Sequence, residues 1–217
     1  MTKEQIFDSL RQLGEELDAQ GLCGEMLLTG GAAMCLVHDA RDMTKDVDAL
    51  YEPKPEINQI AAKIAERNGL PADWLNDGVK GFLTPTAAKE DFIALKGLRI
   101  QTVSTEYLLA MKLMSSRYGG RDSEDIRFLF RKLGITTFEQ ASKIVTTYYD
   151  VNTILPRVKY VIDSILEEQW SKGKSQLAPQ EKKKGLTARI AEARKKVDAQ
   201  SQEADKTKSR TKDQNER

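Results

Sequence analysis

Residues 27–33 read Leu-Leu-Thr-Gly-Gly-Ala-Ala, an apolar run that ends in a glycine pair and continues with small side chains. The apolar run at 26–29 lies between glycines and is too short for a helix, so it predicts a buried strand. Residues 32–37 contain no turn former, which predicts a helix directly after the turn at Gly30 and Gly31. Such a glycine pair lets the backbone approach a ligand, and the free N–H groups of the helix end favour a phosphate.

A second motif, Asp-Val-Asp, begins at Asp46, fifteen residues after Gly31. Residues 46–51 alternate polar and apolar at first and then become apolar, which predicts a strand with one end at a site. Asp46 and Asp48 are two residues apart, so they point to the same side of that strand. Two neighbouring carboxylates can share a hard cation such as Mg²⁺. Each motif taken alone also fits an ordinary turn or an exposed strand edge.

The rest of the chain becomes progressively helical. Hydrophobic spacing and capping residues predict helices near 2–20, 57–68, 107–117, 122–133, 138–148 and 156–170, and a pair of strands at 92–95 and 98–103. The expected fold class is therefore α+β, with a small mixed sheet and flanking helices followed by a helical half. The expected organisation is an α/β core over 1–103, a helical region over 104–170 that completes the site, and a charged tail over 171–217.

The near-neutral total of 34 Lys+Arg against 33 Asp+Glu conceals a divided chain. Residues 171–217 hold 14 basic and 7 acidic side chains, whereas residues 1–170 hold 20 and 26. The tail contains no aromatic residue and cannot bury enough apolar area to order itself, which predicts disorder with at most a transient helix near 187–198. Two interpretations of the tail stay open: a sequence-blind electrostatic arm for nucleic acid, or a solvated extension without function.

Several functional classes are excluded. The two cysteines, Cys23 and Cys35, cannot build a disulfide framework, and with the single histidine, His38, they cannot form a structural zinc site. The sequence contains no apolar run of about 18 residues and no basic start of a signal peptide, so we expect a cytoplasmic protein without a membrane partner. Walker A, GxGxxG, HExxH and Gly-x-Ser-x-Gly motifs are also missing.

Four motifs in order resemble a known family. They are LTGGAA at 28–33, RxxTKDVD at 41–48, LAxKLxxxR at 109–117 and RDxxDI at 121–126. Together they resemble the nucleotidyltransferase superfamily, and within it the AbiEii-type branch that contains toxins of type IV toxin-antitoxin systems. The resemblance covers about residues 5–135.

The resemblance implies an enzyme, a toxin-like, Mg²⁺-dependent nucleotidyltransferase that moves NMP from an NTP to an acceptor hydroxyl, with RNA such as tRNA as the suggested acceptor and a cognate antitoxin as a partner. Gly30 and Gly31 would hold the β- and γ-phosphates of the nucleotide. Asp46 and Asp48 would be catalytic and would bind the metal. Lys112 would reach the phosphates from its helix.

The last motif adds the final site residue, Asp125, which by the same resemblance would position or deprotonate the acceptor. Asp122, in the same motif, is equally well explained as a helix N-cap. For Arg117 and Arg121, an ion pair and a substrate contact remain alternatives.

One departure leaves the function open. Many members of the superfamily supply a third carboxylate from a later strand, whereas residues 98–103 contain none and Asp91 is the nearest substitute. The alternative function is therefore a catalytically weakened nucleotidyltransferase fold that serves as a nucleotide-binding or partner-binding module.

Overall fold

The computed structural model describes residues 1–115 and 121–177, with the side chains of Arg121 and of 169–177 left out. The chain divides into two compact units, Met1–Ser171 and Lys172–Arg217. Both regions predicted within 1–170 belong to the first unit. The predictions for most of the tail, including the helix near 187–198, lie outside the described residues.

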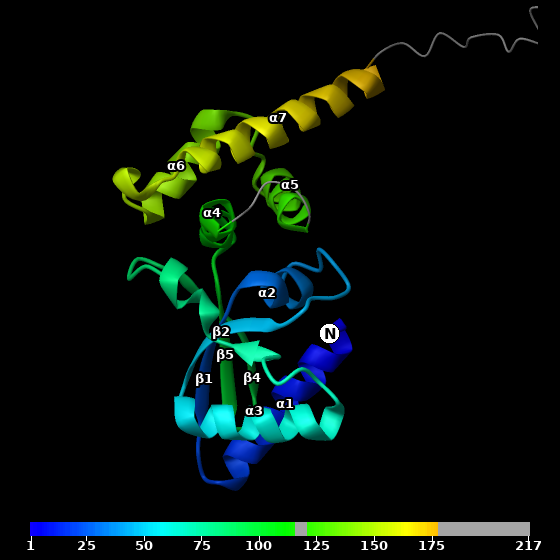
Figure 1. Ribbon diagram of the computed structural model, residues 1–217, viewed down its shortest axis with the longest axis vertical. Helices are drawn as coiled ribbons and strands as arrows, with labels where there is room; N and C mark the ends of the chain where they lie inside the picture. The colour runs from blue at the N-terminus through cyan, green and yellow to red at the C-terminus, as the bar shows by residue number, and fades with distance from the viewer. Residues whose placement is uncertain (116–120, 178–217) are drawn as a thin grey trace, which may run out of the picture. The chain divides into compact units, whose positions relative to one another are not determined.

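The first part of the chain contains a mixed five-stranded sheet (Figure 1). Its strands are β1 (Gly24–Leu28), β2 (Val47–Glu52), β3 (Leu75–Asn76), β4 (Lys89–Leu95) and β5 (Leu98–Val103), in the order β3-β2-β1-β5-β4. β1 pairs in parallel with β5 and antiparallel with β2, and β2 pairs in parallel with β3. The fold is α+β, as the sequence predicts.

Along the chain, helices lie before, between and after these strands. They are α1 (Lys3–Ala19), α2 (Gly30–Leu36), α3 (Lys54–Asn68), α4 (Thr105–Ser115), α5 (Arg121–Leu133), α6 (Phe138–Tyr148) and α7 (Pro156–Leu177), with 3-10 turns η1 (Gly78–Phe82) and η2 (Val151–Thr153). Thr2 and Gln5 close the predicted capping box of α1. Ser104 caps α4 as predicted, because its hydroxyl accepts from the backbone N–H of Tyr107 at 3.2 Å.

The two faces of the sheet differ in what covers them. Met26, Ala49 and Ile100 point to one face and are buried under α1 and α3. Strand alternation places Asp48 and Leu50 on the opposite face, beyond which lie α4 and η1. The predicted site residues therefore emerge where β1 and β2 meet the helical half.

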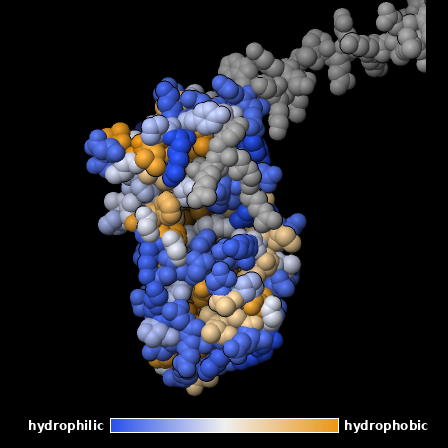
Figure 2. Space-filling view, viewed as in Figure 1, coloured by the Kyte–Doolittle hydropathy of each residue, from blue (hydrophilic) through white to orange (hydrophobic). Residues whose placement is uncertain are grey.

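The helical half packs around α4. Every residue of α4 from Tyr107 to Leu113 is buried, because the helix contacts α5 on one side and α6 on the other. α7 contributes the buried residues Val158, Val161, Ile162 and Ile165. Figure 2 shows apolar side chains gathered over α6 within a mainly hydrophilic surface.

Three sequence predictions need correction. The last helix continues to Leu177 rather than ending near Trp170, so residues 171–177 of the predicted tail are helical. β3 and η1 were not predicted. Asp122 is no N-cap, because α5 already begins at Arg121.

Within the described residues, no helix is long and apolar enough to cross a membrane.

Gly14 brings the backbone of α1 into close contact with the turn between β4 and β5. A Cβ at Gly14 would lie 2.3 Å from the carbonyl oxygen of Lys96. Alanine usually favours a helix by about 1 kcal/mol over glycine, but overpacking costs about 1–3 kcal/mol and a backbone carbonyl cannot rotate away. We expect Gly14→Ala to lower the free energy of unfolding by about 1 kcal/mol in urea denaturation.

Gly81→Ala is the matched control, because a Cβ there would meet no atom within 4 Å. Stabilisation of the protein by Gly14→Ala would contradict the close contact.

Candidate active site at the junction of the sheet and the helical half

Gly30 allows the carboxylate of Asp48 to reach the turn after β1. Its φ of +56° is one that side-chain-bearing residues rarely adopt, and a Cβ would lie 2.5 Å from Oδ2 of Asp48. The backbone N–H of Thr29 donates to the carbonyl oxygen of Asp48 at 2.9 Å, and the Thr29 hydroxyl donates to the same oxygen at 3.1 Å. Glycine is thus required here by both conformation and space.

Gly31 makes room for the segment that precedes β2. A Cβ at Gly31 would lie 2.1 Å from Oγ1 of Thr44 and 2.2 Å from Nη2 of Arg41. The Arg41 guanidinium donates from Nη2 to the Thr44 hydroxyl at 3.3 Å. The space beside Gly31 is therefore filled by the protein itself.

The two aspartates predicted to bind metal influence each other. Burial raises the pKa of Asp48, the negative charge of Asp46 raises it further, and the charge of Lys112 acts in the opposite direction. The amide nitrogen of Asn76, on β3, lies 3.4 Å from Oδ2 of Asp46. The pair is thus held close enough for repulsion, which a bound cation would relieve.

Lys112 lies between carboxylates of α5. Its Nζ lies 2.8 Å from Oδ2 of Asp125 and 3.0 Å from Oδ1 of Asp122. The side chains of Lys112 and Asp125 are only 10% and 5% exposed, whereas Asp122 is 43% exposed. Nη1 of Arg41 lies 3.5 Å from the same Oδ2 of Asp125. Among the described residues this oxygen has no hydrogen bond of regular geometry, so the two cations stabilise it mainly by charge.

Several of these groups line one cavity of about 200 Å³. Its polar lining includes Gly30, Asp48, Lys112 and Asp122, and its apolar lining is Val79, Phe82, Leu108 and Met111. The structure thus brings the glycine turn, one member of the aspartate pair and the lysine to one cavity. The α5 carboxylate that lines it, among the described residues, is that of Asp122 rather than Asp125.

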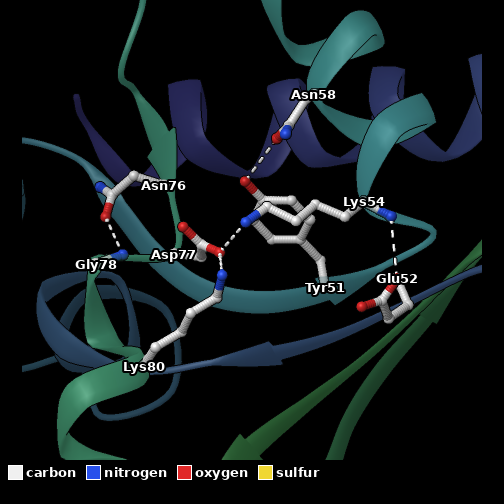
Figure 3. A network of polar contacts seen from close by, with 8 residues as sticks. All are labelled: Tyr51, Glu52, Lys54, Asn58, Asn76, Asp77, Gly78 and Lys80. Atoms are coloured by element: carbon white, nitrogen blue, oxygen red, sulfur yellow. Dashed lines mark hydrogen bonds and ion pairs between the residues drawn. The ribbon is translucent and has the colours of Figure 1, made fainter.

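A short polar network anchors the start of η1, whose residues Val79 and Phe82 line this cavity (Figure 3). Asp77 accepts from Lys54 and Lys80, and these bonds, that of Lys54 first, lower the pKa of Asp77 to about 2. The backbone N–H of Gly78 donates to Oδ1 of Asn76 at 2.9 Å. η1 is thereby tied to the residue that contacts Asp46.

The donor set fits magnesium only in part. Asp46 and Asp48 offer the oxygen ligands that Mg²⁺ prefers, and Mg²⁺ is commonly held by one or two carboxylates together with substrate phosphates. No cluster of three or more His, Cys, Asp or Glu that could hold a metal occurs in the described part of the chain. The aspartate pair therefore fits an ion only if that ion takes its remaining ligands from outside these two carboxylates.

The substitute third carboxylate, Asp91, does not join the site. It lies on the edge strand β4, where it accepts from Arg99 at 2.7 Å and Gln101 at 3.0 Å. The register places Gln101 on the sheet face that carries Leu50 and Asp48. A third carboxylate from β5 would have to lie on this face. The polar side chain of β5 nearest to the Asp48 end of this face is that of Gln101, which is an amide.

Sequence reasoning missed two contributors. Arg41 belongs to a quoted motif, but its contact with Asp125 spans 84 residues and has no local signature. Asn76 lies on a strand of two residues that carries no periodicity. Arg117 and the side chain of Arg121 lie outside the described residues.

Comparisons with known proteins add no relatives: no family model, curated protein or solved structure matches this chain.

Removal of Lys112 should destabilise the fold. Among the described residues, Lys112→Met leaves Asp125 with the more distant Arg41 as its cation. Breaking a buried ion pair typically costs about 3 kcal/mol or more. We expect a loss of about that size in urea denaturation, with partial recovery when Asp125→Asn is added. Lys80→Met is the control, because its exposed pair should contribute less than about 1 kcal/mol. Equal effects of the two lysine variants would contradict the buried pair.

The pKa of Asp48 predicts a pH dependence of stability. Because this pKa is raised above 3.8, the folded protein binds the proton more tightly than the unfolded chain. Wild-type stability should therefore fall relative to Asp48→Asn as the pH rises from the ordinary aspartate range through the raised pKa. Urea unfolding with EDTA, from acid to neutral pH, measures the difference. Parallel profiles of the two proteins would refute the shift.

Proposed function

We propose that this chain is a Mg²⁺-dependent nucleotidyltransferase that moves NMP from an NTP to an acceptor hydroxyl. The observation that carries the proposal is the contact of Asp48 with the Gly30 turn at a cavity that Lys112 also lines. A carboxylate pair that can hold a cation beside a lysine is suited to a triphosphate, whose charge needs both.

Each residue has a distinct task in this proposal. Asp46 and Asp48 would hold Mg²⁺, which when bound supplies charge stabilisation at the reacting phosphate and activates the attacking hydroxyl. Lys112 would bind phosphate oxygens from α4. Gly30 would leave the phosphates room beside Asp48, while Gly31 admits Arg41 and Thr44.

Asp125 has a different role from the one that the resemblance implies. Its side chain is 5% exposed and contacts Lys112 and Arg41. We therefore assign Asp125 to the orientation of Lys112 rather than to the acceptor. Asp122, which lines the cavity, competes with a phosphate for the same ammonium group.

RNA is the acceptor class that we propose, in a toxin-like protein of the cytoplasm with a cognate antitoxin. The family resemblance suggests the acceptor. Residues 171–217 hold 14 basic and 7 acidic side chains, and this basic excess suits the binding of a polyanion. Such an arm would bind phosphates without reading sequence.

A second candidate function is nucleotide binding without transfer. The position of Asp91 favours it, because that carboxylate is bonded to Arg99 and Gln101 away from the aspartate pair. Lys112 and the pair would then still bind a nucleotide, but the second metal of a two-metal mechanism would lack a ligand.

Incorporation of label from four radiolabelled NTPs into total RNA and total protein tests transfer. We expect metal-dependent labelling that EDTA abolishes and that Asp48→Ala lowers at least about 100-fold, because the charge stabilisation at the phosphate is lost. Asp91→Ala is the matched control and should retain activity.

Since Asp48→Ala removes a carboxylate that is costly to bury, unfolding should not explain its loss of activity. Labelling by Asp48→Ala at the wild-type rate would exclude the proposed enzyme. Nucleotide binding by the wild type without any transfer would favour the second candidate.

A further inference from the structure

The cavity has a polar end and an apolar end. Asp48, Lys112 and Asp122 belong to the polar end. The apolar end consists of Val79 and Phe82 from η1 and of Leu108 and Met111 from α4. Val79, Leu108 and Met111 are 7%, 1% and 5% exposed, whereas Phe82 is half-buried and so presents part of its surface to the cavity. With Mg²⁺ held by the aspartate pair as proposed, a ligand that fills this cavity would have an anionic part at the polar end and a flat or apolar part at the other.

Phe82 is held more firmly than an ordinary loop residue. Its carbonyl oxygen accepts from the hydroxyl of Tyr107 at 3.2 Å and from that of Tyr149. The backbone N–H of Thr84 donates to the Tyr107 hydroxyl at 2.6 Å. The two tyrosine rings are stacked with centroids 6.3 Å apart, and Tyr148 meets Tyr107 edge-on at 4.7 Å. Two elements of the helical half thus fix the backbone that carries the Phe82 ring.

The size of the cavity limits what it can enclose. Sites for whole small-molecule ligands usually measure about 300–1,000 Å³, so a volume of about 200 Å³ accommodates only part of a nucleoside triphosphate. Stacking of a planar base against Phe82 and Met111 buries its apolar faces while its polar edge can stay in water, whereas burial of a ribose there would leave its hydroxyls without partners. The base is the part of a nucleotide that fits the apolar end.

Polar groups that could recognise one base are scarce at this end. Among the described residues that line the cavity, Ser115 is the uncharged side chain with a hydroxyl, and it donates to the carbonyl oxygen of Lys112 at 3.5 Å. Apolar contact distinguishes bases by stacking area rather than by hydrogen-bond pattern.

We propose that Phe82, held by Tyr107 and Tyr149, is the stacking platform for the nucleobase of the bound NTP, and that the site selects the base by stacking. This inference rests on the proposed function, and it adds the substrate specificity: all four NTPs bind, with purines bound more tightly than pyrimidines.

Isothermal titration calorimetry of the full chain with Mg²⁺ tests the platform. The ligands are the four NTPs and inorganic tripolyphosphate, which has the anionic part without a base. The variants are Phe82→Leu, which keeps apolar bulk and removes the ring face, and Phe82→Trp, which enlarges the face. Phe92→Leu is the matched control, because Phe92 is a half-buried aromatic residue of β4 outside this cavity. Urea denaturation verifies that each variant is folded.

We expect Phe82→Leu to weaken the binding of ATP and GTP about tenfold, since stacking of one base contributes roughly 1–3 kcal/mol, and to leave tripolyphosphate binding unchanged. Phe82→Trp should retain or tighten NTP binding. Phe92→Leu should match the wild type for every ligand.

Three results would overturn the proposal. If Phe82→Leu binds NTPs as the wild type does, or weakens tripolyphosphate equally, the ring does not contact the base although the nucleotide site stands. If tripolyphosphate binds the wild type as tightly as ATP, the base makes no useful contact. If neither NTP nor tripolyphosphate binds, the nucleotide site itself is wrong, and the proposed function fails with it.

Discussion

The approach of the Asp48 carboxylate to the Cα of Gly30 is the constraint on which the site depends. It requires a residue without a Cβ in a left-handed conformation, and it joins the end of β1 to the face of β2 that carries Asp48 and Leu50. The same turn places Gly31 against Arg41 and Thr44, so that the loop before β2 packs on the helix after β1. Both glycines therefore have a structural explanation that holds whether or not a nucleotide binds, and the proposed function takes its support from the cavity.

Buried charge is the second organising feature of the site. Lys112 is compensated by Asp125, and Asp125 is in turn compensated by Arg41, so one row of alternating charges connects α4, α5 and the loop before β2. Removal of Lys112 takes from the buried Asp125 its nearer cation, which is costlier than loss of a surface pair. Such a row holds the lysine in one orientation, and orientation of a cation before a substrate arrives is a large part of electrostatic catalysis.

The sequence allowed the local structure to be predicted better than the contacts. The Thr2 and Gln5 cap and the two strands of the glycine and aspartate motifs follow from chemistry within a few residues, and the structure confirms them. The part played by Arg41 could not be predicted, because it depends on how two distant segments fold together. Of the two interpretations of Asp122, the N-cap was wrong, since a short polar residue before an apolar run looks the same whether it caps the helix or pairs with a lysine of another element.

The hold of two tyrosines on the Phe82 carbonyl connects positions that are far apart in the chain. Tyr149 lies 67 residues from Phe82, just after α6, yet its hydroxyl shares that oxygen with Tyr107. A chain that exchanged Tyr149 for phenylalanine would keep the ring packing but leave Tyr107 as the remaining hydroxyl on this carbonyl. Positions 107 and 149 are therefore expected to change together during evolution, and substitutions in the helical half would shift the backbone that carries the Phe82 ring without any substitution in β2.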